Sequence, residues 1–247
     1  MKIVPEKRSY RRFQKPDGFT SFEVIVGESD LWISVPESEF CDEIVRKVKE
    51  KVVSIRAVLK EFIDKHPAFY ASLEPVSVPP LAPAVVLKMA KAAELSGVGP
   101  MAGVAGAFNY FVGRELESFG LSEFIIENGG DLYISLRREV TVALITGDLR
   151  VDGKIGFKLP PGKWGVCTSS SKIGHSLSFG QTRSATAIAE DPVIADCAAT
   201  YLGNSSSLEE ARRRVEEVSK LLWGGIIYIE GSFVLSGNVE IVRVSLS

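Results

Sequence analysis

Residues 123–136 read EFIIENGGDLYISL, which is two apolar runs on either side of a polar segment containing two glycines. The runs Glu123–Glu127 and Asp131–Leu136 have the β-branched and aromatic content typical of strands. The segment Asn128-Gly129-Gly130-Asp131 has two interpretations. It is either a hairpin turn, for which Asn-Gly is a strong signal, or a ligand-binding turn that presents bare amides to a phosphate or ribose. Residue chemistry alone favours the turn.

Elements on both sides of this hairpin extend the pattern. Further strands are predicted within 19–35, over 140–146 and 164–167, and near 226–229 and 239–244, and amphipathic or capped helices over 42–66, 84–95, 192–202 and 207–222. Strands and helices alternate irregularly, and short turns join several strand pairs. The expected fold class is therefore α+β, with mixed or antiparallel sheets packed against helices rather than a doubly wound parallel sheet. We expect a single domain over residues 1–247, or two intimately packed α/β lobes.

The composition excludes several classes of partner. A formal net charge of −2, without a long run of like charge, argues against nucleic acid. The first residues, MKIVPEKRSYRRF, contain no apolar run suited to a signal peptide or membrane anchor. Three cysteines in 247 residues do not form a disulfide framework. These features predict a cytoplasmic protein that binds neither nucleic acid nor membrane. Only four Asn and two Gln in the chain favour a thermophilic source.

Asp196 and Thr200 are four residues apart on the predicted helix 192–202, so their side chains share one helical face. Carboxylate and hydroxyl oxygens are hard ligands that, together with phosphate oxygens, suit Mg²⁺. The alternative is structural. In that case Asp196 interacts favourably with the helix dipole and Thr200 bonds to a carbonyl one turn back.

Polar residues follow the predicted strand 164–167, where Thr168 and Ser169 begin a run of four hydroxyl side chains. His175, one of two histidines in the chain, comes shortly afterwards. Histidine transfers protons near neutral pH. A polar loop with a structural histidine explains the same residues equally simply.

Taken in order, NGGD, GVCTSSS, a histidine and ADCAATYLG resemble the ApbE superfamily, whose founding activity is the transfer of FMN from FAD to protein. That superfamily has an NxGGD segment, a VATSG strand and loop, a HIIDPRTG stretch and ADALATAL on a helix. The resemblance covers roughly residues 97–203. The stretch VGPMAGVAGA, beginning at Val98, is similar to a branch of the superfamily that lacks an export signal.

The resemblance implies a role for each matching residue. Asn128, Gly129, Gly130 and Asp131 would line a nucleotide pocket that Thr168 and Ser169 border, with FAD or FMN as the cofactor. Asp196 and Thr200 would hold Mg²⁺ against a pyrophosphate. His175 would be the catalytic acid or base.

The departures from the family pattern narrow the expected activity. The residues 175–180, HSLSFG, lack the Asp, Pro and Arg of HIIDPRTG. We therefore expect an enzyme that binds a phosphate-bearing, nucleotide-like molecule with Mg²⁺, related to the FMN transferases but not a standard one. The alternatives are a non-catalytic flavin-binding module and an enzyme of anaerobic sulfur assimilation towards homocysteine, a role suggested for the signal-less branch. The sequence leaves a homodimer open.

Overall fold

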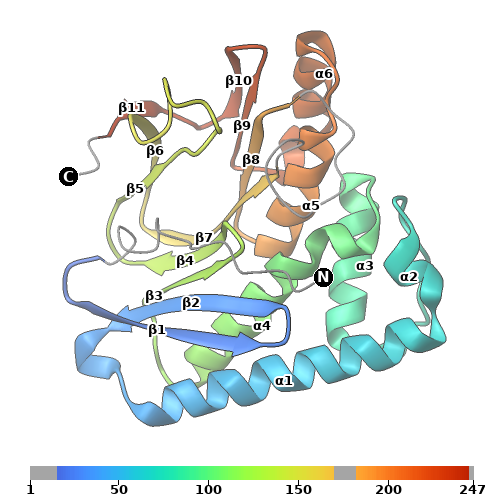
Figure 1. Ribbon diagram of the computed structural model, residues 1–247, viewed down its shortest axis with the longest axis vertical. Coiled ribbons are helices and arrows are strands. Elements are labelled where there is room, and N and C mark those ends of the chain that lie inside the picture. Colours follow the sequence, from blue (N-terminus) through green and yellow to red (C-terminus); the bar gives the residue numbers. More distant parts are fainter. Residues whose placement is uncertain (1–15, 170–181, 245–247) are drawn as a thin grey trace.

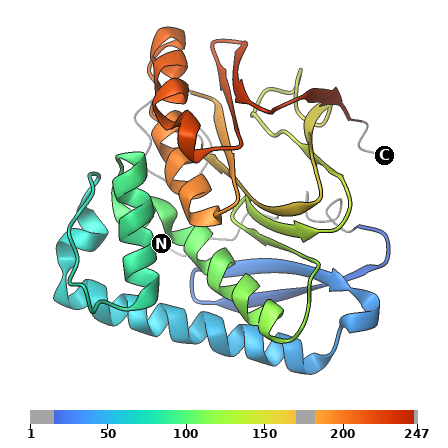
Figure 2. The same cartoon turned by 180° about the vertical axis from the view of Figure 1, so that it is seen from behind.

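The computed structural model describes residues 16–169 and 182–244, and this part of the chain forms two antiparallel sheets covered by six α-helices (Figures 1 and 2). The predicted α+β class with antiparallel sheets is confirmed. The division into one domain or two lobes stays a prediction.

The larger sheet has eight strands in the order β1-β2-β3-β4-β7-β8-β9-β10, and every neighbouring pair is antiparallel. Short turns join β1 to β2, β3 to β4 and β9 to β10, whereas the connections from β2 to β3 and from β8 to β9 contain the helices. The strands are β1 (Phe19–Val26), β2 (Ser29–Pro36), β3 (Phe124–Asn128), β4 (Asp131–Leu136), β7 (Gly162–Ser169), β8 (Ser184–Ala189), β9 (Gly224–Ile229) and β10 (Ser232–Gly237).

The stretch EFIIENGGDLYISL forms the β3–β4 hairpin at the centre of this sheet. Asn128 pairs with Asp131, which leaves a two-residue turn of Gly129 and Gly130. Their φ angles of 69° and 102° lie in the left-handed region, which favours glycine. A side chain at either glycine would meet no other atom within 4 Å, so backbone conformation rather than space requires glycine here. The turn interpretation is confirmed, and the turn leaves Asp131 at the first position of β4.

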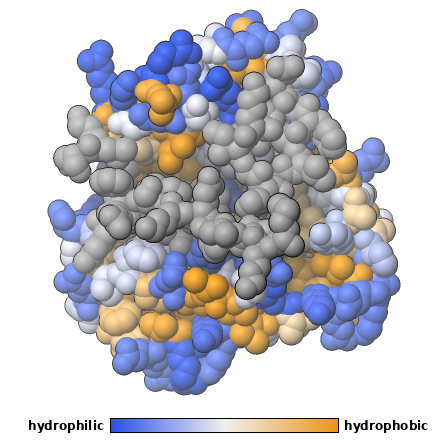
Figure 3. Space-filling model, in the orientation of Figure 1, coloured by the Kyte–Doolittle hydropathy of each residue, from blue (hydrophilic) through white to orange (hydrophobic). Residues whose placement is uncertain are grey.

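Helices cover one face of the large sheet. The long helix α1 runs below the β1–β2 hairpin in Figure 1, and α5 packs on β7 and β8 near the middle of the molecule. On the surface seen in Figure 3, hydrophobic residues gather over the β1–β2 hairpin, where Ile25 is 56% exposed. The helices are α1 (Asp42–Lys65), α2 (Pro67–Ala71), α3 (Ala84–Ser96), α4 (Val104–Ser118), α5 (Pro192–Gly203) and α6 (Leu208–Val218), with short 3₁₀ turns at Glu37–Glu39, Pro100–Gly103 and Ser219–Leu221.

Helix α5 approaches α4 closely enough to exclude a side chain between them. A Cβ atom at Gly106 would lie 2.3 Å from the Pro192 carbonyl oxygen, a contact that no real Cβ makes. On its buried sides α5 contributes Val193 and Cys197 to the apolar cluster under α1, α3 and α4, and Ala198 and its neighbours to the cluster under α6. The small residues of both helices thus place the middle of α5 directly beside the start of α4.

The three-stranded sheet, in the order β11-β6-β5, covers the opposite face of the large sheet. Phe157 and Leu159 of this small sheet are completely buried against Ile134 and Val166 of the large one. Its strands are β5 (Val140–Ala143), β6 (Ile155–Leu159) and β11 (Ile241–Arg243).

Most predicted elements lie within a few residues of the observed ones, but β6, β8 and β10 were not predicted. Gly97 ends α3 with φ 68°, and Ser207 accepts a hydrogen bond from the Glu210 amide at the start of α6. None of the helices in the described part of the chain combines the length and apolar character needed to span a bilayer.

Candidate functional site

Asp131 projects from the first position of β4 towards α5. Its Oδ1 accepts a hydrogen bond from the Thr168 amide at 2.9 Å, and its backbone carbonyl accepts one from Asn109 Nδ2 at 3.0 Å. Only 9% of the residue is exposed. The hairpin turn on one side and β7 on the other therefore hold this carboxyl group in one orientation.

Asp196 projects from the second turn of α5 into the same space. Its Oδ2 accepts a hydrogen bond from the Gly106 amide at 2.8 Å, and the Ala105 amide also bonds to this carboxyl group. These are amides of the first turn of α4, whose own N-cap, Gly103, has no side chain to offer. Asp196 thus caps α4 from another helix. The predicted interaction with a helix dipole exists, but the helix is α4 rather than α5.

Asp131 and Asp196 are hydrogen-bonded to each other, and their titrations influence each other. Burial is the main cause that raises the pKa of Asp131 to about 7, and the negative charge of Glu127 adds to it, while the hydrogen bond from the Thr168 amide acts in the opposite direction. Burial and the charge of Asp131 raise the pKa of Asp196 well above its usual range, despite the α4 amides. The two groups therefore form an acid pair that retains a proton near neutral pH.

Two cysteine thiols lie beside this acid pair. Cys167 is completely buried beside the Asp131 carboxyl group, and its thiol donates a hydrogen bond to the Pro192 carbonyl oxygen at 3.5 Å. Cys197, one residue after Asp196, is also completely buried. Burial and the nearby carboxyl groups raise the pKa of both thiols well above the usual range. Such thiols are poor nucleophiles, and neither cysteine forms a disulfide.

The remaining predicted residues lie around the acid pair at different distances. Thr168 contributes its amide to Asp131, but its hydroxyl bonds to that of Thr186 at 2.8 Å, which directs its side chain to the other face of the sheet. Ser169 lies beside Gly203 at the end of α5, and its buried Oγ has no hydrogen-bond partner among the described residues. Thr200 is half-buried one turn after Asp196, and Asn128 donates weakly to the Ala105 carbonyl at 3.5 Å.

The structure thus brings the Asn128–Asp131 turn, the Thr168 amide and Asp196 together, although Asp131 and Asp196 are 65 positions apart in the sequence. His175 lies outside the described residues. The roles that the resemblance implies for all these residues stay predictions.

Sequence reasoning missed two buried polar residues next to the site. Glu127 is completely buried, and its Oε1 accepts a hydrogen bond from the Gly130 amide at 2.7 Å, so its side chain is bonded to the turn. Asn109 is also completely buried, and its Oδ1 has no partner within the described part of the chain. The sequence contained one signal for each of these residues. Glu127 is a charged residue at the end of the apolar run FIIE, and Asn109 is an amide within the apolar helix segment AFNYFV.

The acid pair could also take a divalent cation. Within residues 16–169 and 182–244, no ion pair includes Asp131 or Asp196, and no group of three or more His, Cys, Asp or Glu side chains is arranged to hold a metal. Mg²⁺ usually takes one or two carboxylates from the protein and completes its shell with water and phosphate oxygens. The donor set of two adjacent carboxyl groups fits that pattern.

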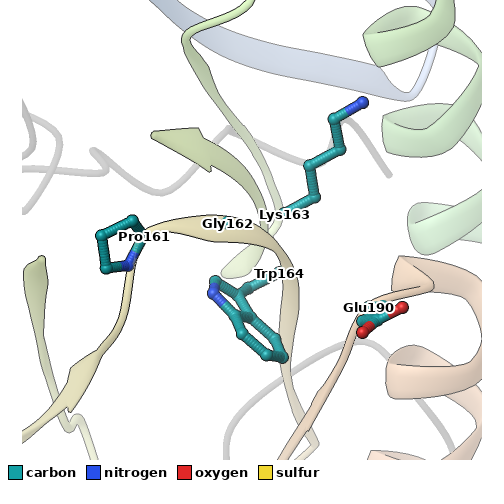
Figure 4. A pocket seen from close by; sticks show the side chains of 5 residues that line it. All are labelled: Pro161, Gly162, Lys163, Trp164 and Glu190. Atoms are coloured by element: carbon teal, nitrogen blue, oxygen red, sulfur yellow. The ribbon is translucent and has the colours of Figure 1, made fainter. Parts of the chain in front are cut away.

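A separate hollow of about 400 Å³ lies at the start of β7, whereas Thr168 is near the end of that strand. Pro161, Gly162, Lys163, Trp164 and Glu190 line it, and Figure 4 shows Lys163 and Trp164 pointing to opposite sides of the strand. Lys163 is already paired with Glu117 at 2.6 Å. The convergence of buried polar groups favours the acid pair, rather than this hollow, as the functional site.

Comparison with known proteins places this chain in a family. The family model described as AbpE bacteria matches residues 11–220. A UPF0280 protein of Methanococcus aeolicus is 35% identical over 207 residues, which is 80% of each chain, and one of Methanopyrus kandleri is 37% identical over 222 residues, 88% of each. Among solved structures, the flavinyl transferase ApbE of Pseudomonas stutzeri, in its apo form, gives a TM-score of 0.60 at 13% identity, covering 88% of this chain and 93% of that one. At this identity the likeness shows the fold alone.

Proposed function

This chain belongs to the family described as AbpE bacteria, and from that premise we propose that it binds a phosphate-bearing small molecule together with Mg²⁺ at the Asp131–Asp196 pair. A flavin nucleotide is the first ligand to test, because a protein of the same fold is named a flavinyl transferase. The proposal includes an enzymatic reaction that differs from standard FMN transfer.

One observation carries this proposal, the direct contact of two buried carboxyl groups with no cationic side chain paired to either among the described residues. Such a pair keeps a proton unless a cation replaces it. When bound, Mg²⁺ would supply the positive charge that offsets both the carboxylates and the phosphates of the ligand. The site therefore offers a cation-binding position that is set before the ligand arrives.

The surrounding residues of this chain orient the pair. The Thr168 amide holds Asp131 at 2.9 Å and the Gly106 amide holds Asp196 at 2.8 Å, so neither carboxyl group can rotate freely. Thr200, one turn after Asp196, would add a hydroxyl ligand on the same helical face. The turn Gly129-Gly130, which precedes Asp131, is exposed and has open space around it, since a Cβ at either residue would touch nothing.

Standard FMN transfer is not proposed, because the stretch that follows His175 lacks the Asp, Pro and Arg of the transferase pattern. The role in sulfur assimilation is not favoured either, since the burial and raised pKa of Cys167 and Cys197 argue against thiol chemistry. A flavin-binding module without catalysis is the second candidate, and the same fold likeness supports it.

Calorimetric titration with FAD and FMN, with and without Mg²⁺, tests the proposal on wild type and Asp196→Asn. The substitution keeps the shape of the side chain but removes the charge, so binding in Mg²⁺ should weaken by at least about tenfold, or ~1.4 kcal/mol. Asp64→Asn makes the same chemical change at an exposed position of α1 and should bind like wild type.

Equal affinity of wild type and Asp196→Asn in Mg²⁺ would contradict the metal site. Incubation with FAD and a threonine-containing acceptor peptide should leave the peptide unmodified, and covalent flavin on it would contradict the departure from standard transfer. Binding without turnover of any flavin nucleotide would favour the non-catalytic module.

A further inference from the structure

The large sheet ends at β1 on one side and at β10 on the other, and the two edges differ in composition. Strand β1 carries the charged residue Glu23 at an exposed position, which is a common protection against pairing with another chain. Strand β10, SFVLSG, has no charged residue and no proline. No strand among the described residues pairs with its outer edge. The β10 edge is therefore the one open to another strand.

The backbone groups of β10 that face outward can be identified from the register. The Tyr228 carbonyl of β9 accepts a hydrogen bond from Arg183, so the backbone groups of Tyr228 point away from β10. Phe233 lies directly opposite Tyr228, and its own amide and carbonyl consequently point to the free edge. Leu235, two residues further on, points the same way. These two residues offer four hydrogen-bonding groups at the edge.

The side chains of β10 are apolar on one face and mixed on the other. Phe233 is 36% exposed and Leu235 45% exposed on the face away from α6. Val234 lies between Ser232 and Ser236 on the other face, where a hollow of about 230 Å³ separates β10 from α6. An uncharged edge strand with exposed apolar side chains and an adjacent hollow has the properties of a pairing surface.

We propose that β10 pairs with β10 of a second copy of this chain, antiparallel about a two-fold axis through Val234. In this register Phe233 lies opposite Leu235 of the partner copy, and the outward groups of both residues meet as a hydrogen-bonded pair. The same register brings the apolar side chains of each face next to one another. This pairing is independent of the function proposed above.

The charges of α6 support the second copy as the occupant. Arg212 and Glu216 are exposed, line the hollow beside β10 and are one helical turn apart. Neither forms an ion pair with another described residue. The two-fold axis places both α6 helices on the same face of the joined sheet and in opposite directions. The dimer that we propose pairs Arg212 of each copy with Glu216 of the other.

Sedimentation velocity over a concentration series tests the pairing. Wild type should be a dimer, and Leu235→Lys should weaken the dimer by at least about tenfold, because it brings a desolvated charge to the apolar edge. Leu81→Lys is the matched control, since Leu81 is 97% exposed in the connection between α2 and α3 and its substitution should leave the dimer unchanged.

Charge reversal on α6 provides a test that does not alter the strand. Arg212→Glu and Glu216→Arg should each weaken the dimer, and the double variant should restore it, because the two residues would exchange roles across the axis. Circular dichroism establishes that each variant is folded. A monomeric wild type, or a dimer that is insensitive to both Leu235→Lys and the α6 reversals, would overturn the proposal.

Discussion

Asp131 and Asp148 have similar exposed fractions, 9% and 7%. The pKa values of their carboxyl groups nevertheless depart from that of an ordinary aspartate in opposite directions. Burial raises the pKa of Asp131 to about 7, whereas hydrogen bonds from the Arg150 side chain hold the pKa of Asp148 well below its usual range. The Asp148 carboxylate accepts a hydrogen bond from the Arg150 side chain at 2.6 Å and one from the Tyr228 hydroxyl at 2.8 Å. Asp131 accepts a hydrogen bond from one amide, and its other neighbours are an acid and a thiol.

The difference teaches that the exposed fraction alone does not decide the charge of these residues, because burial dominates at Asp131 and an arginine partner dominates at Asp148. Asp148 is covered mainly by its own loop near the surface and is supplied with an arginine and a tyrosine. Asp131 lies between the sheet and α5, where the nearest ionisable neighbours are acidic. A stabilised carboxylate is typical of a structural loop, while a carboxyl group left without a cation is typical of a functional site.

The largest expected effect comes from Asp131→Asn. Because the folded-state pKa of Asp131 is about 7 and the unfolded value is near 3.8, the folded protein binds more protons between these values. As the pH rises from 4 to 7, the free energy of unfolding of the wild-type protein therefore falls by up to about 4 kcal/mol because of Asp131. Urea denaturation should show Asp131→Asn gaining stability relative to wild type across this range. Asp64→Asn should show no such gain, and a pH-independent difference for Asp131→Asn would contradict the shared proton.

A smaller effect is expected from Gly106→Ala, which tests how α4 and α5 hold the pair. In a helix, Gly→Ala usually stabilises by roughly 0.5–1 kcal/mol. Here the added Cβ would lie 2.3 Å from the Pro192 carbonyl oxygen, so the helices must separate. We expect a loss of about 1–3 kcal/mol in urea denaturation at constant pH. A gain in stability would show that the close approach of the helices is not needed.

The smallest effect is expected from Tyr228→Phe, which removes one of the two partners of Asp148 and leaves Arg150 in place. A carboxylate with a lowered folded-state pKa contributes stability above its unfolded pKa, and this contribution disappears as the pH falls. The lowered pKa keeps Asp148 ionised in the folded protein at both pH 7 and pH 3, so the melting temperature of the variant should be slightly lower than that of wild type at both values. Tyr70→Phe, at a 64% exposed position, is the control. A deficit that is present at pH 7 but absent at pH 3 would contradict this account of Asp148.

The sequence predicted the parts of the fold whose signals are local. The hairpin is an example, because β4 coincides with the predicted range and β3 is displaced by one residue. Strand β8, SATAIA, was not predicted because three of its six residues are alanine, which has little preference for strands. Its conformation depends on β7 and β9, with which it pairs on both sides, and on α5 above it.

The site was predictable to a similar extent. Helical spacing placed Asp196 and Thr200 on one face, and the family resemblance grouped Asp196 with the Asn128–Asp131 turn. The cap that Asp196 provides to α4 could not be predicted, because it depends on the distance between two helices. Glu127 was missed because a single acidic residue after an apolar run is as consistent with a strand end as with a buried partner.

The cap of α4 also has a consequence for how the chain is made. The amide of Gly106 and the carboxylate that satisfies it are 90 positions apart. When α4 leaves the ribosome, its first turn has no partner for these amides, since the preceding residues supply no side-chain cap. The helix start is completed only after β3 to β8 have been synthesised and α5 has docked. In this protein, one of the most local features of secondary structure is thus one of the last to form.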